Sequence, residues 1–155
     1  MKGFVRIMAV VVVVTFAPPS ALPVDDRPDQ PQPQSPDLEA GRKALDTKDY
    51  KSALGHLIKA AKETPSDADV HNLLGFSYRK LGQFDRALEH YRLALKIDPN
   101  HRGAHEYIGE LYLETGQLAN AERQLQALHK ACPWFGRCPE YEDLKEAVEK
   151  YKVKR

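Results

Sequence analysis

Residues 74–99 have the sequence LGFSYRKLGQFDRALEHYRLALKIDP, and several of these residue types recur at one interval in the segments before and after it. The interval is 34 residues, as three sets show: Gly41, Gly75 and Gly109; Ala53, Ala87 and Ala121; Pro65, Pro99 and Pro133. Self-similarity at a fixed period of this size is the signature of a solenoid built from stacked repeats. Because such proteins usually work by presenting a surface, the repeat favours binding over catalysis as the function.

The composition of the chain excludes some classes of partner. Of its 155 residues, 23 are lysine or arginine and 22 are aspartate or glutamate, which gives a formal net charge of +1. A nucleic-acid binder usually carries a strongly basic surface, so we expect no nucleic-acid partner. A protein or peptide partner, recognised by local features of the surface, is the expectation.

The first 21 residues have the pattern of a secretory signal peptide. Lys2 and Arg6 precede an apolar run from Ile7 to Ala17, and the small residues Ser20 and Ala21 follow it. The run has 11 residues, whereas a transmembrane helix needs roughly 20. We therefore expect no stable membrane span after signal cleavage, with an uncleaved anchor as the alternative. The mature protein is expected to be periplasmic or secreted.

Residues 22–35 are predicted to be a Pro-rich disordered linker. Prolines alternate there with aspartate and glutamine, and the segment has too few apolar residues to offset the entropy of ordering it.

From Asp37 onward, the apolar spacing predicts two helices in each repeat. The first helices of the later repeats should end at Gly82 and Gly116, because glycine readily takes the positive φ that closes a helix. The second helices should end near the repeated prolines, since a residue before proline avoids the α region. Tyr78 and Tyr112 are expected in the core. The glycines inside the first helices are expected to face Ala53, Ala87 and Ala121 and to let the paired helices approach closely.

This arrangement resembles the tetratricopeptide repeat, over Gln34 to about Phe135. The second repeat matches the pattern best, at Leu74, Gly75, Tyr78, Gly82, Ala87, Tyr91, Ala94 and Pro99. The resemblance implies an all-α, right-handed α-solenoid of three helix pairs over residues 36–135, with repeats at 34–67, 68–101 and 102–135. An apolar stripe in residues 136–155 predicts the capping helix that a solenoid requires. The Cys-to-Cys loop before it also resembles the ending of small exported bacterial proteins of this family.

The resemblance also implies a binding surface. In tetratricopeptide proteins the first helices line the concave face, and the 34-residue register transfers those positions to this chain. The candidate partner-binding residues are Arg42, Asn72, Phe76, Arg79, Lys80, Glu106, Glu110 and Leu113. The groove is expected to be basic around an aromatic in the middle and acidic at the third repeat. Phe76 is either an anchor for a partner or a packing residue against a neighbouring helix or the Pro-rich leader.

The family's clamp for a terminal carboxylate is not expected, because Glu106 and Glu110 stand at its third-repeat positions.

Cys132 and Cys138 are expected to form a disulfide, because an exported chain meets an oxidising compartment. Trp134 and Phe135, inside the loop that the disulfide closes, are expected to pack under the cap, with contact to a partner as the alternative.

No catalytic motif, metal site or cofactor is predicted. His101 and His105 are four residues apart, a spacing that can chelate a metal, but the glutamate that metalloprotease helices carry after the first histidine is missing. We interpret both as surface or interface histidines.

The sequence thus predicts a non-enzymatic protein-interaction or assembly module of the bacterial cell envelope that binds a partner segment in its concave groove. A self-associating structural protein, a homo-oligomer, is the second hypothesis. A metal-binding or enzymatic accessory protein is the third.

Overall fold

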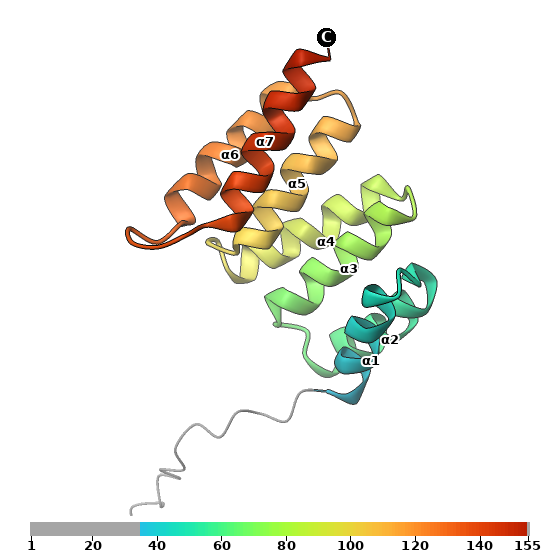
Figure 1. The fold of residues 1–155 in the computed structure, drawn as a ribbon. Coiled ribbons are helices and arrows are strands. Elements are labelled where there is room, and N and C mark those ends of the chain that lie inside the picture. Colours follow the sequence, from blue (N-terminus) through green and yellow to red (C-terminus); the bar gives the residue numbers. More distant parts are fainter. Residues whose placement is uncertain (1–34, 155) are drawn as a thin grey trace, which may run out of the picture. The chain divides into compact units, whose positions relative to one another are not determined.

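The computed structural model describes residues 35–154, which form seven helices and no strand (Figure 1). The helices are α1 (Pro36–Asp46), α2 (Tyr50–Glu63), α3 (Ala68–Lys80), α4 (Phe84–Ile97), α5 (Arg102–Glu114), α6 (Leu118–Ala131) and α7 (Pro139–Val153). Each helix packs mainly against its neighbours in the chain, and α7 packs against both α5 and α6. The expected all-α repeat solenoid is therefore confirmed. The predicted signal peptide and the linker up to residue 34 lie outside the described residues.

The turns inside the repeats have the expected left-handed backbone. Gly82 and Gly116 have φ values of 72° and 78°, and Lys48 takes the equivalent place in the first repeat with a φ of 60°. Asp49 and Asp67 then cap the helices that follow, by accepting hydrogen bonds from the backbone N–H groups of Ser52 and Val70. None of the described helices has the length and apolar character needed to cross a membrane.

The glycines inside the first helices do not have the alanines of the second helices as their nearest neighbours, so that expectation is wrong. A Cβ atom on Gly41 would lie 2.8 Å from Cδ2 of Leu57, and one on Gly75 would lie 2.5 Å from Cδ1 of Tyr91. Large side chains of the second helices thus occupy the space that each glycine leaves open. The alanines are fully buried all the same.

Gly109 differs from the other two glycines because its neighbour comes from the cap. A Cβ atom there would lie 2.6 Å from Cδ1 of Leu144 on α7. Leu144 and Val148 are fully buried, and they form a second core cluster with Leu113 and Leu128. The cap is therefore packed into the third repeat rather than laid over its end.

The two core clusters meet at the third repeat. The first cluster contains Leu57, Leu74, Tyr91 and Ile108, and Tyr112 packs against both clusters. Tyr78 is buried as expected, whereas Tyr112 is only half-buried.

Candidate functional site

The predicted partner-binding residues lie on the first helices of the three repeats, and we call them the first-helix surface. Its members are Arg42 on α1; Asn72, Phe76, Arg79 and Lys80 on α3; and Glu106, Glu110 and Leu113 on α5. Lys80 is exposed, and Arg42, Phe76 and Glu110 are half-buried. The other four are buried, and Leu113 belongs to the core cluster beneath α7.

Phe76 lies at the centre of an aromatic group. Its ring centroid is 6.2 Å from that of Tyr50 on α2 and 5.1 Å from that of Tyr107 on α5. Lys80 Nζ lies 5.1 Å from the Phe76 centroid, within the range of a cation–π interaction. Phe76 therefore packs against neighbouring helices, as one of the two interpretations held, and still leaves part of its ring accessible. The position of Tyr107, adjacent to a predicted site residue, was the only sequence signal for its role.

Arg79 is the best-satisfied charge of the surface. Its side chain is only 2% exposed, and its Nη2 atom lies 2.5 Å from Oε2 of Glu110. Its Nη1 atom lies 2.9 Å from Oε1 of Glu114. The guanidinium carbon also lies 5.4 Å from the centroid of the Tyr107 ring. Its positive charge is thus neutralised within the protein, and Lys80 carries the exposed positive charge in the middle of the surface.

Several buried polar atoms of the first-helix surface have no hydrogen-bond partner. Within residues 35–154 there are four such side-chain atoms: Arg42 Nε, Asn72 Oδ1, Arg79 Nε and Tyr91 Oη. The first three belong to the first-helix surface, but the Arg79 side chain interacts with that of Tyr91, which leaves Arg42 and Asn72. Buried polar groups in folded proteins are almost always hydrogen-bonded, so this surface has hydrogen-bonding capacity that the chain itself leaves unused.

Glu106 is also a buried residue, although its carboxylate oxygens are not among the fully enclosed atoms without a partner. The residue is 9% exposed, and no described side chain donates a hydrogen bond to its carboxylate or forms an ion pair with it. Burial, reinforced by the negative charges of Glu110, Asp143 and Glu140, raises the pKa of Glu106 to about 8, and the charge of Arg79 opposes this rise only in part. The Glu106 carboxyl group is therefore mostly protonated at neutral pH.

A pocket lies at the α5–α7 end of this surface. It has a volume of about 350 Å³ and is lined by Glu110, Leu113 and Glu114 from α5 and by Ala147, Lys150, Tyr151 and Lys154 from the cap and the residue after it. The lining combines apolar side chains with charges of both signs, so the pocket suits part of a peptide better than a single small anion.

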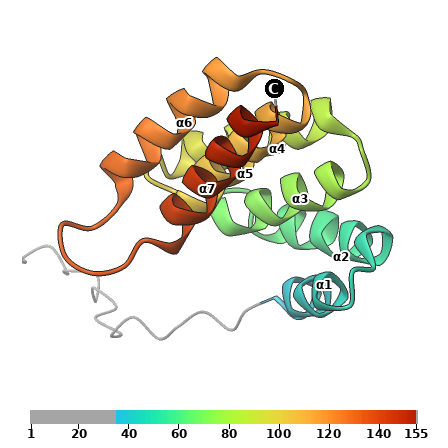
Figure 2. The same cartoon turned by 45° about the horizontal axis from the view of Figure 1, so that its top comes forward.

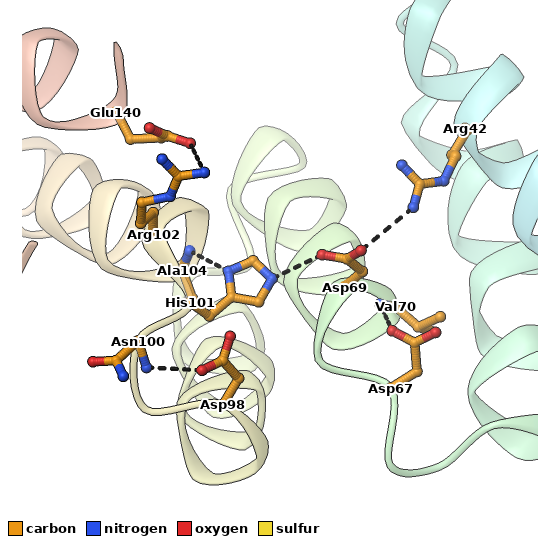
Figure 3. Close-up of polar contacts among 10 residues, drawn as sticks. All are labelled: Arg42, Asp67, Asp69, Val70, Asp98, Asn100, His101, Arg102, Ala104 and Glu140. Carbon is orange, nitrogen blue, oxygen red and sulfur yellow. Dashed lines mark hydrogen bonds and ion pairs between the residues drawn. The ribbon is translucent and has the colours of Figure 1, made fainter. Parts of the chain in front are cut away.

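A polar network joins the beginnings of the first helices (Figure 3). Asp69 on α3 lies between Arg42 and His101: Oδ2 is 3.8 Å from Arg42 Nη2, and Oδ1 is 3.0 Å from His101 Nε2. His101 Nδ1 accepts a hydrogen bond from the N–H of Ala104, so His101 caps α5 and uses both ring nitrogens. This network ties the first repeat to the second, and the second to the third.

His105, four residues further on, is engaged elsewhere. Its ring nitrogens contact Gln124 Oε1 at 2.8 Å and the Pro99 carbonyl oxygen at 3.0 Å. Nowhere in residues 35–154 do three histidine, cysteine, aspartate or glutamate side chains gather in a way that could hold a metal ion.

Polar pairs at one register position, which we did not predict, join the two helices of each repeat. They are Asp37–His56 at 2.7 Å, His71–His90 at 3.2 Å and His105–Gln124 at 2.8 Å. Each pair has the same sequence separation, 19 residues. The equivalence of His71 and His105 was visible in the sequence, whereas their partners differ in residue type and gave no signal.

The loop between α6 and α7 carries a second notable surface. The disulfide between Cys132 and Cys138 is present, as expected. Trp134 and Phe135 are 91% and 83% exposed, so the expectation that they pack under the cap is wrong. Leu144 and Val148 already fill the space between the cap and the third repeat, and the loop extends beyond the ends of both helices (Figure 2).

Comparison with known proteins agrees with the helical-repeat fold described above. Residues 68–101 match the family model of the tetratricopeptide repeat. No curated protein matches the sequence. Among solved structures, the fold is similar to that of the TPR2B domain of yeast Sti1 in a pHsp70 complex. The two sequences are 18% identical, the TM-score is 0.70, and the match covers 77% of this chain and 95% of that chain.

Two further structures show the same fold. One is the Sgt2 TPR domain from Aspergillus fumigatus, with 21% identity, a TM-score of 0.66 and coverage of 76% of each chain. The other is the Yersinia enterocolitica type III secretion chaperone SycD in complex with a peptide of the translocator YopD, with 21% identity, a TM-score of 0.64, and coverage of 76% of this chain and 91% of that chain.

Proposed function

Because residues 68–101 form a tetratricopeptide repeat and the described chain has the fold of tetratricopeptide-repeat proteins, we propose that this protein is a non-enzymatic binding module. Its first-helix surface takes an extended segment of a partner protein. Similar structures include complexes with a peptide of the translocator YopD and with pHsp70, and these support a peptide as the class of ligand.

The observation that carries the proposal is the set of unused polar atoms. Arg42 Nε and Asn72 Oδ1 are buried without partners, one a donor and the other an acceptor. An extended peptide offers a backbone N–H and C=O at every residue, so it can satisfy donors and acceptors together. Phe76 and Lys80 add a partly exposed aromatic ring and a positive charge beside them.

We place this activity outside the cytoplasm, in the periplasm or beyond. The proposal is supported by the signal-peptide pattern of residues 1–21 and by the disulfide between Cys132 and Cys138, a bond that persists in oxidising compartments. The intact mass of the protein from the cell envelope should show the loss of about twenty N-terminal residues. Recovery of the full-length chain from the cytoplasm alone would contradict it.

Site-directed photo-crosslinking in living cells tests the binding site. Benzoylphenylalanine introduced at Lys80, an exposed position on α3, should give a crosslink to a discrete partner. The matched control is the same group at Lys96, an exposed lysine of the second helix α4. Crosslinking at Lys96 but not at Lys80 would move the binding site away from the first-helix surface.

Asn72→Leu separates binding from folding. The Oδ1 atom of Asn72 has no partner in the protein, so an apolar side chain of similar volume should preserve the melting temperature while reducing the Lys80 crosslink several-fold. An unchanged crosslink would show that Asn72 does not contact the partner.

A second candidate function is self-association, which the exposed Trp134 and Phe135 favour. Large aromatic side chains exposed together are typical of interfaces. Light scattering on the purified protein distinguishes the two: a monomer at micromolar concentration excludes self-association as the main function.

A further inference from the structure

We propose that the Glu106 end of the first-helix surface binds the basic side chain, lysine or arginine, of the segment that this surface takes. The inference rests on the proposed function and specifies the chemistry of one position in the ligand. It concerns a stretch of the surface where two buried residues, Asn72 and Glu106, carry acceptors, and where the nearby cations Arg79 and Arg102 already pair with other carboxylates.

The Glu106 carboxylate lies among negative charges from two helices. Glu110 lies on the same helix, and Glu140 and Asp143 come from the cap. The nearby cations are already paired with other carboxylates: Arg79 with Glu110 and Glu114, and Arg102 with Glu140 at 3.6 Å. Within residues 35–154, neither Arg79 nor Arg102 pairs with Glu106 itself.

Asn72 provides an independent second acceptor. It stands at the same register position as Glu106 in the preceding repeat, it is 7% exposed, and its Oδ1 has no donor. Its Nδ2 atom lies 3.1 Å from the place that a Cβ on Gly103 would occupy. Asn72 therefore lies against α5 one helical turn before Glu106. A buried amide oxygen without a donor and a carboxylate without an ion pair favour a ligand with several N–H groups.

An organic cation fits these acceptors better than a metal ion. Ca²⁺ takes six to eight oxygen ligands, whereas no suitable group of three ligand side chains exists among the described residues. Lysine offers three N–H donors and arginine five. The rings of Phe76 and Tyr107, 5.1 Å apart, offer the apolar contact that the stem of such a side chain needs.

The protonation state of Glu106 makes this binding dependent on pH. With burial and Glu110, Asp143 and Glu140 raising the pKa of Glu106 to about 8, and Arg79 opposing, the empty site holds a proton at neutral pH. A cation that pairs with the carboxylate displaces this proton. Affinity should therefore rise from pH 6.5 to pH 9, a range in which a primary amine with a pKa near 10 stays largely charged.

The test uses n-butylammonium as the probe, because it has the stem and the ammonium group of lysine. In the purified protein with ¹³C-labelled glutamate, the Glu106 side-chain signal should shift saturably at pH 9, and binding should be at least tenfold weaker at pH 6.5. By titration calorimetry at pH 9, Glu106→Gln should abolish binding, whereas Glu39→Gln, at an exposed site on α1, should leave it unchanged.

Three outcomes would overturn the proposal: no saturable shift of Glu106 at pH 9, equal binding by the Glu106→Gln variant, or saturation by Mg²⁺ at a lower concentration than by butylammonium. These outcomes do not depend on the partner. If the Lys80 crosslink persists while butylammonium fails to bind, the binding module stands and only the basic ligand position is wrong.

Discussion

The second and third repeats share one register, but different residues pack beside their equivalent glycines and pair with their charged side chains. In the second repeat, the space beside Gly75 is filled by Tyr91 of the same repeat, and the charge of Arg79 is neutralised by two carboxylates. In the third repeat, the space beside Gly109 is filled by Leu144 of the cap, and Glu106 has no partner. The third repeat is therefore packed against a helix from outside it, α7, whereas the second repeat fills the equivalent space itself.

Leu144→Ala should have the largest effect on stability. Leu144 is fully buried against Gly109, so the free energy of unfolding should fall by about 3 kcal/mol. Leu125→Ala is the matched control, because Leu125 holds the register position of Tyr91 but is only half-buried. Urea unfolding followed by circular dichroism measures both variants. A larger loss for Leu125→Ala would mean that Leu125, and not Leu144 of the cap, makes the main packing contact of the third repeat.

Gly75→Ala should destabilise the protein by about 2 kcal/mol, because the new methyl group would overlap the ring of Tyr91. Gly55→Ala provides the contrast. Gly55 is an exposed helical glycine with no heavy atom within 4 Å of the added Cβ, so alanine should stabilise the protein by about 0.5–1 kcal/mol. Thermal melts of the two variants should shift in opposite directions, and a shared direction would contradict the close contact at Gly75.

Glu106→Gln should stabilise the protein at pH 9 by about 1–2 kcal/mol, because it removes an unpaired buried charge. Burial and the neighbouring acidic groups raise the pKa of Glu106 in the folded protein from 4.5 to about 8, so the folded state holds this proton more tightly than the unfolded chain. The free energy of unfolding should therefore decrease as the pH rises through this interval. Urea titrations at pH 5 and pH 9 should show a smaller decrease in the variant, and equal decreases would contradict the assignment.

Replacement of both Trp134 and Phe135 by alanine should change stability least, by less than about 0.5 kcal/mol, because both side chains are largely exposed. Sedimentation of the variant and the unsubstituted protein shows whether the loop makes contacts between molecules. A large loss of stability in a monomeric protein would show that the loop packs as the sequence had suggested.

The repeated glycines, alanines and prolines were enough to predict the helix pairs, because a fixed period places equivalent backbone positions in equivalent surroundings. Gly82 and Gly116 even indicated where the backbone takes a positive φ. The register could not show that Leu144 would fill the space beside Gly109, since that contact joins different elements.

The sequence predicted where the candidate site lies, but not which of its side chains are buried or paired. The register placed Arg79 and Glu106 on one surface, but it could not reveal that both residues are buried, or that Arg79 lies between two other carboxylates. The exposure of Trp134 and Phe135 was also missed, because apolar residues beside a cap are more often buried than projected on a loop.

The His71–His90 pair gives the second repeat a sensitivity to acid. His71 Nε2 contacts the Pro65 carbonyl, which assigns a proton to that nitrogen, and His71 Nδ1 then accepts from His90 Nδ1 at 3.2 Å. Burial and the charge of His71 lower the pKa of His90, so the folded repeat favours a neutral His90 ring. The folded repeat therefore holds a proton on His90 less tightly than the unfolded chain does, and protonation of His90 in an acidified compartment opposes the folded state. Acid would thus weaken the second repeat, the one that matches the family model, through a single side chain between its two helices.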